Sequence, residues 1–159
     1  MGGGYQTDTV SRLETNIDDC TAEILGATMD RLFAAGALDV WLTPIHMKKN
    51  RPGVLLSCLC AQELVDDMAE IIFRETSAFG LRLEKVVRLK LDRRFETVAT
   101  EWGNVIVKLG LKDGQVVQAS PEFASCREVS EQSGQPLRVI YEAANRAWAT
   151  RGVETPEKE

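Results

Sequence analysis

The chain has 159 residues, of which 44% are hydrophobic and 27% are charged, and its mean hydropathy is -0.16. These values are typical of a folded protein with one ordinary domain or two small ones, and they exclude a large multidomain enzyme and a disordered chain. The longest apolar stretch, residues 53–61, is much shorter than the roughly 18 residues of a membrane-spanning helix, and the N-terminus lacks a signal-peptide pattern. We therefore expect a cytoplasmic protein without a membrane partner.

The charge balance argues against nucleic acid as a partner. Nineteen Lys and Arg residues against 24 Asp and Glu residues give a net charge of -5, which repels a polyphosphate backbone. An anion site would need a local concentration of positive charge, and the chain has two such stretches, at 48–51 and 82–94. The second stretch is interrupted by Glu84 and Asp92, which is typical of the solvent face of a strand.

The order of the predicted elements indicates an α+β fold that begins with a ferredoxin-like subdomain at 10–92. Residues 1–9 contain three glycines without periodicity and predict a flexible leader. Apolar periodicity then predicts β-α-β-β-α-β, which gives a four-stranded antiparallel sheet with both helices on one face. The strands are expected at 10–17, 38–47, 53–61 and 81–91, and the helices at 21–36 and 61–76.

A small α+β subdomain is expected at 93–150, followed by a charged tail at 151–159. Two alternating runs around Trp102-Gly103-Asn104 predict a β-hairpin, and a short strand follows the Asp113-Gly114 turn. Two helices come next, because Gly134 ends one and Pro136 begins the other. The ranges are 94–100 and 105–112 for the hairpin, 115–120 for the short strand, and 121–133 and 137–150 for the helices.

The four cysteines lack the paired CxxC spacing of a zinc site. Cys58 and Cys60 lie two residues apart in an apolar strand and therefore face the same side. They are either small core residues, which is common for free cysteines, or part of a soft metal site. The single histidine, His46, excludes a mechanism that needs two imidazoles.

Acidic side chains gather where the first strand is expected to end. Glu14, Asp18 and Asp19 precede a helix that Thr21 and Glu23 favour at its start. Two adjacent carboxylates at such a place can hold a hard cation such as Mg²⁺ and leave positions for phosphate oxygens. The alternative is that Asp18 or Asp19 only caps the helix.

A basic loop connects the second and third predicted strands. Lys48, Lys49 and Arg51 place three cations in four residues around Asn50, ahead of Pro52-Gly53. Such a loop concentrates positive charge and suits a triphosphate, since an Arg can bind two oxygens at once. The alternative is a solvated hairpin tip, which also protects a sheet edge from aggregation.

A third polar segment ends the second predicted helix. Arg74 and Glu75 are followed by the hydroxyls of Thr76 and Ser77. Helix ends attract such residues for local reasons, so this segment alone is a weak functional signal.

Together the three segments resemble the C-terminal domain of the LarC nickel-insertion proteins of nickel-pincer cofactor synthesis. Pro121-Glu122-Phe123 followed by Cys126-Arg127 is similar to a later motif of that family, and the resemblance covers residues 12–148. The three segments are Glu14-Thr15-Asn16-Ile17-Asp18-Asp19, Met47-Lys48-Lys49-Asn50-Arg51-Pro52-Gly53 and Ile71-Ile72-Phe73-Arg74-Glu75-Thr76-Ser77.

The resemblance implies a domain that binds CTP with Mg²⁺ or Mn²⁺. In this family CTP drives the loading of Ni²⁺ into pyridinium-3,5-bisthiocarboxylic acid mononucleotide, the precursor of the lactate racemase cofactor, and CMP and pyrophosphate are released. Family members usually carry a larger N-terminal domain, so we expect the complete CTP-dependent nickel chelatase activity from the full-length protein. The resemblance also implies a homo-oligomer. The expected metal ligands are Asp18, Asp19 and Glu14, and the expected nucleotide-binding residues are Lys48, Lys49, Asn50, Arg51, Arg74 and Thr76.

A function of another class stays open. The same fold is compatible with a noncatalytic ferredoxin-like module that forms oligomers or binds a small regulatory ligand, because fold alone does not decide function. Nucleotide-dependent stabilisation distinguishes the two.

Overall fold

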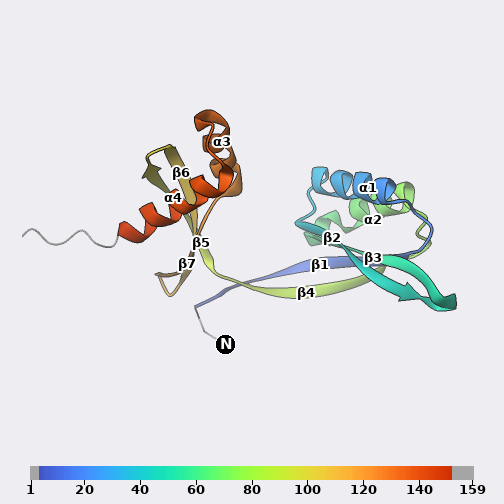
Figure 1. Cartoon of the computed structure of the whole chain (residues 1–159). Coiled ribbons are helices and arrows are strands. Elements are labelled where there is room, and N and C mark those ends of the chain that lie inside the picture. Colours follow the sequence, from blue (N-terminus) through green and yellow to red (C-terminus); the bar gives the residue numbers. More distant parts are fainter. Residues whose placement is uncertain (1–3, 152–159) are drawn as a thin grey trace, which may run out of the picture. The chain divides into compact units, whose positions relative to one another are not determined.

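The computed structural model describes residues 4–151, which form two compact units. One unit comprises residues 7–89, and the other comprises the remaining described residues. Figure 1 shows that each unit combines one sheet with two helices, so the predicted α+β class is confirmed. The predicted tail from residue 152 onward and the first three residues of the predicted leader lie outside the described residues.

The first unit has the predicted β-α-β-β-α-β order. Its sheet has the strand order β2-β3-β1-β4, which is that of a ferredoxin-like fold. Short 3₁₀ turns at Lys48–Asn50 and Gln62–Leu64 precede β3 and α2. The elements are β1 (Gln6–Ile17), α1 (Ala22–Ala34), β2 (Asp39–Met47), β3 (Arg51–Cys60), α2 (Val65–Glu75) and β4 (Arg82–Lys90).

The first strand is longer than predicted, and the expected leader is shorter. β1 begins at Gln6 and includes residues 7–9, which the sequence assigned to the leader. These residues lack apolar periodicity, so their pairing could not be foreseen. Asp8 accepts two hydrogen bonds from the Arg88 guanidinium on β4, at 3.0 and 2.8 Å. A long-range ion pair therefore accompanies a strand segment without a hydrophobic signal.

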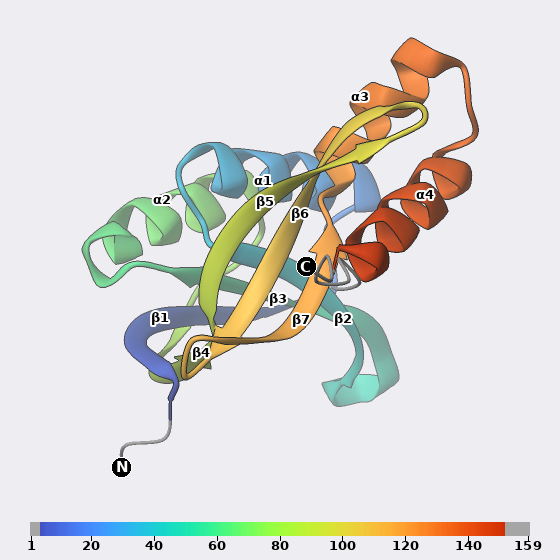
Figure 2. The same cartoon turned by 90° about the vertical axis from the view of Figure 1, so that its left-hand side faces the viewer.

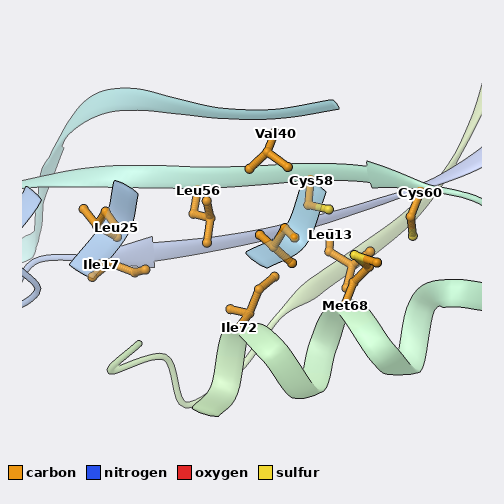
Figure 3. Packing of buried hydrophobic residues seen from close by; sticks show 10 residues of the cluster. Leu13, Ile17, Leu25, Val40, Leu56, Cys58, Cys60, Met68 and Ile72 are labelled. Atoms are coloured by element: carbon orange, nitrogen blue, oxygen red, sulfur yellow. The ribbon is translucent and has the colours of Figure 1, made fainter. Parts of the chain in front are cut away.

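Helices α1 and α2 lie on one face of this sheet and bury its core (Figure 1). In Figure 3, Leu13 of β1 and Leu56 of β3 point toward Met68 and Ile72 of α2. Ile24 and Phe33 of α1 are apolar but exposed. The core cluster comprises Leu13, Ile17, Leu25, Leu32, Val40, Leu56, Cys58, Cys60, Met68 and Ile72.

Cys58 and Cys60 are core residues, as the first of the two interpretations proposed. Both side chains are fully buried and free. Burial raises the pKa of Cys58 to about 12 and also raises the pKa of Cys60, so both carry their protons. Among the described residues, no group of three or more His, Cys, Asp or Glu side chains is arranged to hold a metal ion. The soft metal site is therefore not supported.

The second unit contains a three-stranded antiparallel sheet with the order β5-β6-β7, seen side by side in Figure 2. Asp113 and Gly114 both have positive φ in the predicted turn, and Gly134 ends α3 in the left-handed conformation. The elements are β5 (Asp92–Thr100), β6 (Gly103–Lys112), β7 (Gln115–Pro121), α3 (Phe123–Ser133) and α4 (Leu137–Thr150). Across residues 4–151, no helix is long and apolar enough to cross a membrane.

Candidate functional site

A polar pocket of about 450 Å³ lies in the first unit, where the end of β1 meets the connection between α2 and β4. Three polar residues at or just beyond the end of β1 line it: Asn16, Asp18 and Asp19. Ser77 and Phe79 line it from the connection, and Arg82 lines it from β4. Two of the acids predicted to bind a metal therefore share a pocket.

The acid pair is not the cap of α1. Thr21 occupies the N-cap position, and its hydroxyl accepts a hydrogen bond from the backbone N–H of Ile24 at 3.4 Å. The alternative in which Asp18 or Asp19 only caps the helix is therefore wrong. Both carboxylates make other contacts: Asp18 accepts from the Arg51 guanidinium at 3.3 Å, and Asp19 accepts from the hydroxyl of Ser77.

The pocket wall formed by residues 77–80 is fixed by hydrogen bonds along its length and at Thr76, which precedes it. The Thr76 hydroxyl donates to the Ile72 carbonyl at 2.7 Å and accepts from the Ala78 N–H at 3.2 Å. Further along, the hydroxyl of the buried Thr15 donates to the Gly80 carbonyl at 2.9 Å. These bonds tie a segment without regular secondary structure to α2 and β1.

Cys20 links the acid segment to the same wall. The backbone N–H of Ser77 donates to Cys20 Sγ at 3.4 Å, and the Ser77 hydroxyl lies 3.3 Å from the same sulfur. Because Ser77 also donates to Asp19, this one serine contacts both Asp19 and Cys20, which lie just before α1. The orientation of the Asp19 carboxylate is therefore set by its neighbours.

Glu14 is engaged away from the acid pair. It accepts a hydrogen bond from the buried Ser57 hydroxyl at 3.1 Å, and its other partners are Arg12 at 3.5 Å and Arg82 at 3.9 Å. The pKa of Arg12 is raised by its hydrogen bond to Glu84 and by the charge of Glu14. Glu14 does not line the pocket. Its expected role as a metal ligand stays a prediction without support from these contacts.

The residues of the basic loop do not line the pocket, but one of them contacts a residue that does. Lys48, Lys49 and Asn50 form an exposed turn in which Lys49 and Asn50 have left-handed φ values of 62° and 57°. Arg51 follows at the start of β3, and its guanidinium reaches Asp18. The predicted phosphate loop and the predicted metal ligands are therefore in contact.

Gly53 explains why the loop can approach the acids so closely. A Cβ atom at Gly53 would lie 2.7 Å from the carbonyl oxygen of Ile17 and 2.8 Å from the sulfur of Met47. Any larger residue would therefore push β3 away from the end of β1. The Pro-Gly dipeptide after the cations keeps the loop beside Asp18.

Arg74 and Thr76, which the sequence grouped with the nucleotide-binding residues, do not line the pocket. Arg74 pairs with Glu75 at 3.0 Å, and Glu75 also pairs with Arg31 of α1 at 3.2 Å. The Thr76 hydroxyl bonds to the Ile72 carbonyl and to the Ala78 N–H, which anchors the wall. Both residues support the end of α2 in the present structure, and their contact with a nucleotide stays a prediction.

Of the residues that line the pocket, sequence reasoning named only Asp18 and Asp19, and it missed Asn16, Phe79 and Arg82 among others. Asn16 accepts a hydrogen bond from Arg82 at 2.7 Å, and Phe79 is fully exposed at the wall, with a relative exposure of 104%. Asn16 lies inside the segment 14–19 that resembles the family, and this resemblance could have identified it. Arg82 carried no such signal, because it was interpreted as part of a solvated strand face.

Comparison with known proteins identifies the family. Residues 2–141 match the family described as nickel insertion protein. A putative nickel insertion protein of Gloeobacter violaceus is 43% identical over 152 residues, which cover 96% of this chain and 36% of that protein. A pyridinium-3,5-bisthiocarboxylic acid mononucleotide nickel insertion protein of Thermotoga sp. is 40% identical over 131 residues, which cover 82% of this chain and 33% of that protein.

Solved structures agree with this match. LarC2, the C-terminal domain of a cyclometallase involved in the synthesis of the NPN cofactor of lactate racemase, superposes with a TM-score of 0.85 at 38% identity, covering 91% of this chain and 99% of that one. A protein from Methanopyrus kandleri superposes with a TM-score of 0.65 at 28% identity, covering 89% and 90% of the two chains. The chain spans only 36% and 33% of the two sequence relatives. It belongs to the nickel insertion protein family and corresponds to the LarC C-terminal domain.

Proposed function

We propose that this chain is the part of a nickel insertion protein that binds CTP with a divalent cation. In the complete protein, CTP would be converted to CMP and pyrophosphate while nickel, the inserted metal, enters pyridinium-3,5-bisthiocarboxylic acid mononucleotide. The names of the Thermotoga relative and of LarC2 support the nickel chemistry and the cofactor. The observation that carries the nucleotide part is the contact between Arg51 and Asp18, which joins the basic loop to the acid pair.

The acid pair suits a hard divalent cation. Mg²⁺ is usually held by one or two carboxylates together with substrate phosphates, so a cage of three or more protein ligands is not needed. Asp18 and Asp19 both line the pocket and supply those two carboxylates. Such a cation would neutralise negative charge on the phosphate oxygens when bound.

The residues of the loop would bind the phosphates. Arg51 can form two parallel hydrogen bonds to phosphate oxygens, and Lys48 and Lys49 add charge from an exposed turn. In the free protein the Arg51 guanidinium pairs with Asp18, which lines the pocket. Catalysis would then consist of positioning and charge neutralisation, without a protein nucleophile.

Ligand-dependent stability tests this proposal. CTP with Mg²⁺ at about 100 times its dissociation constant should stabilise the fold by about 2.7 kcal/mol, and EDTA should remove most of that gain. ATP with Mg²⁺ serves as the base control. Equal shifts with both nucleotides would leave a polyphosphate site and reject cytidine specificity, and no shift with either would favour the noncatalytic module.

Substitutions assign the roles within the site. Lys49→Ala or Arg51→Ala should weaken CTP binding by about 1.5–3 kcal/mol, because each removes a charge-assisted contact. Arg138→Ala is the matched control, since Arg138 is an exposed cation in the second unit. Asp18→Asn and Asp19→Asn should abolish the Mg²⁺ dependence of CTP binding, because the cation prefers carboxylate to amide. Unchanged affinity in all four variants would refute the site.

A homo-oligomer belongs to the same proposal. β4 lies at the edge of its sheet and exposes Leu83, Val87 and Leu89 on one side. Apolar residues repeated along one side of an edge strand favour contact with a second copy. Light scattering should therefore give a mass above that of one chain, and Val87→Lys should lower it.

A further inference from the structure

We propose that Phe79 is the residue on which the ring of the bound nucleotide stacks. This inference rests on the proposed function, since it names a ring-binding residue for the same pocket. The ligand chemistry is a planar six-membered nitrogen heterocycle attached to a ribose phosphate. Both the pyrimidine of CTP and the pyridinium of the nickel-accepting mononucleotide have that chemistry.

The first argument is the position of Phe79. Its ring is fully exposed although it lines the pocket. Large aromatic residues are usually buried or half-buried. The residue before Phe79, Ala78, packs against the core of the first unit. The chain thus directs the small residue to the core and the aromatic residue to the solvent at the pocket.

The second argument is that the backbone holds Phe79 in this position. The Ala78 N–H is bound to the Thr76 hydroxyl, and the Gly80 carbonyl is bound to the Thr15 hydroxyl. Phe79 lies between these two anchors. A backbone that is anchored on both sides of Phe79 loses less freedom when the side chain binds a ligand, which lowers the entropic cost of stacking.

The third argument is the chemistry of the remaining wall. The Ser77 hydroxyl and the Asn16 amide can hydrogen-bond to ribose hydroxyls or to an exocyclic amine, and Arg82 can donate to an anion. No atom outside residues 79–81 lies within 4 Å of the position that a Cβ at Gly80 would take, so a ligand can approach the backbone next to Phe79. A volume of about 450 Å³ lies within the range of small-molecule sites. Phe79 is the one aromatic residue among the residues that line this pocket.

The test compares probes with and without a ring. The probes are CTP with Mg²⁺, inorganic tripolyphosphate with Mg²⁺, and nicotinate mononucleotide, which has a pyridinium ring. Phe79→Ala should weaken binding of a stacked ring at least about fivefold, the lower end of the range for base–aromatic stacking. Tripolyphosphate binding should change less than twofold by the same estimate, because it has no ring.

Two further variants control for folding and for ring chemistry. Phe33→Ala removes an exposed phenylalanine near the C-terminal end of α1, about 17 Å along the helix from its first residue, and should leave all three affinities unchanged. Phe79→Trp should retain ring binding, and the bound heterocycle should quench its fluorescence.

The outcomes separate this inference from the proposed function. Loss of CTP binding alone assigns Phe79 to the pyrimidine, and loss of nicotinate mononucleotide binding alone assigns it to the pyridinium. If Phe79→Ala binds both rings as the unchanged protein does, the inference is wrong although the nucleotide site stands. If the unchanged protein binds none of the three probes, the proposed function itself fails.

Discussion

The two units have the same layers, one sheet and two helices, but they use their charged residues differently. In the second unit, the pairs Arg127–Glu131 and Arg138–Glu142 lie on helix surfaces, with Glu131 and Arg138 at 72% and 77% side-chain exposure. Such pairs contribute little to stability. In the first unit, Glu14 and Asp18 are only 16% and 21% exposed; Glu14 lies within β1, and Asp18 lies just beyond its end.

This difference separates residues that build the fold from residues that build the site. Both units are stabilised by an apolar cluster between sheet and helices. In the first unit, the Glu14 carboxylate accepts from Ser57 and the Asp18 carboxylate pairs with Arg51 of β3. Partial burial of a carboxylate costs desolvation energy, and the proposed ligand site gives this arrangement a function.

The largest expected effects come from one core substitution in each unit. Leu56→Ala and Leu109→Ala each remove a fully buried side chain and should lower the free energy of unfolding of their unit by about 2–5 kcal/mol. Because the pocket lies within residues 15–82, Leu109→Ala should retain CTP-dependent stabilisation. Urea unfolding with and without CTP measures both.

The comparison breaks if Leu109→Ala abolishes CTP binding while the first unit stays folded. That result would show that the nucleotide site depends on the second unit. Val107→Ile, a small change at another buried position of the same cluster, is a milder control for overall folding.

The sequence was sufficient for most of the fold because the relevant signals are local. Thr21 was recognised as a helix start from its hydroxyl, and Gly134 and Pro136 marked the break between α3 and α4; all three occupy those positions. The beginning of β1 was missed because Gln6 to Thr9 carry no apolar alternation. The side-chain partner of Asp8 is 80 residues away, at Arg88.

The site was only partly predictable for the same reason. Asp18 and Arg51 each had a local signal, a pair of acids and a run of cations. Their contact across 33 positions depends on Gly53, whose need for close packing cannot be seen in one sequence. Arg82 seemed to be an ordinary strand residue, and only the sheet order places it beside Asn16.

A second prediction concerns the buried thiol of the first unit. The pKa of Cys58 is raised from 9.0 to about 12 by burial, so the folded state retains a proton that the unfolded state loses. Stability from this group is fully present below about pH 9 and is lost as pH rises toward 12. Between about pH 8 and pH 10 the loss should be at most about 1.4 kcal/mol.

The measurement compares the unchanged protein with Cys58→Ala by urea unfolding at both pH values. The difference in stability between the two should shrink as pH rises, because the variant lacks the titrating thiol. A constant difference would mean that the Cys58 thiol titrates equally in both states, contrary to its burial in the core.

The smallest expected effect distinguishes the residue that caps α1 from the residues that line the pocket. Thr21→Ala should lower the free energy of unfolding by about 1 kcal/mol or less, since it removes a single hydrogen bond of 3.4 Å to the Ile24 N–H. Thr21→Ser keeps the hydroxyl and should restore stability. Asp19→Asn should change stability by about 0.5 kcal/mol at most, because an amide oxygen can still accept from Ser77.

Thr21 does not line the pocket, so Thr21→Ala should bind CTP normally, whereas Asp19→Asn should lose the Mg²⁺ dependence of CTP binding. The reverse pattern, a stability loss for Asp19→Asn and a binding loss for Thr21→Ala, would return the acids to a structural role and remove the contrast between the two units.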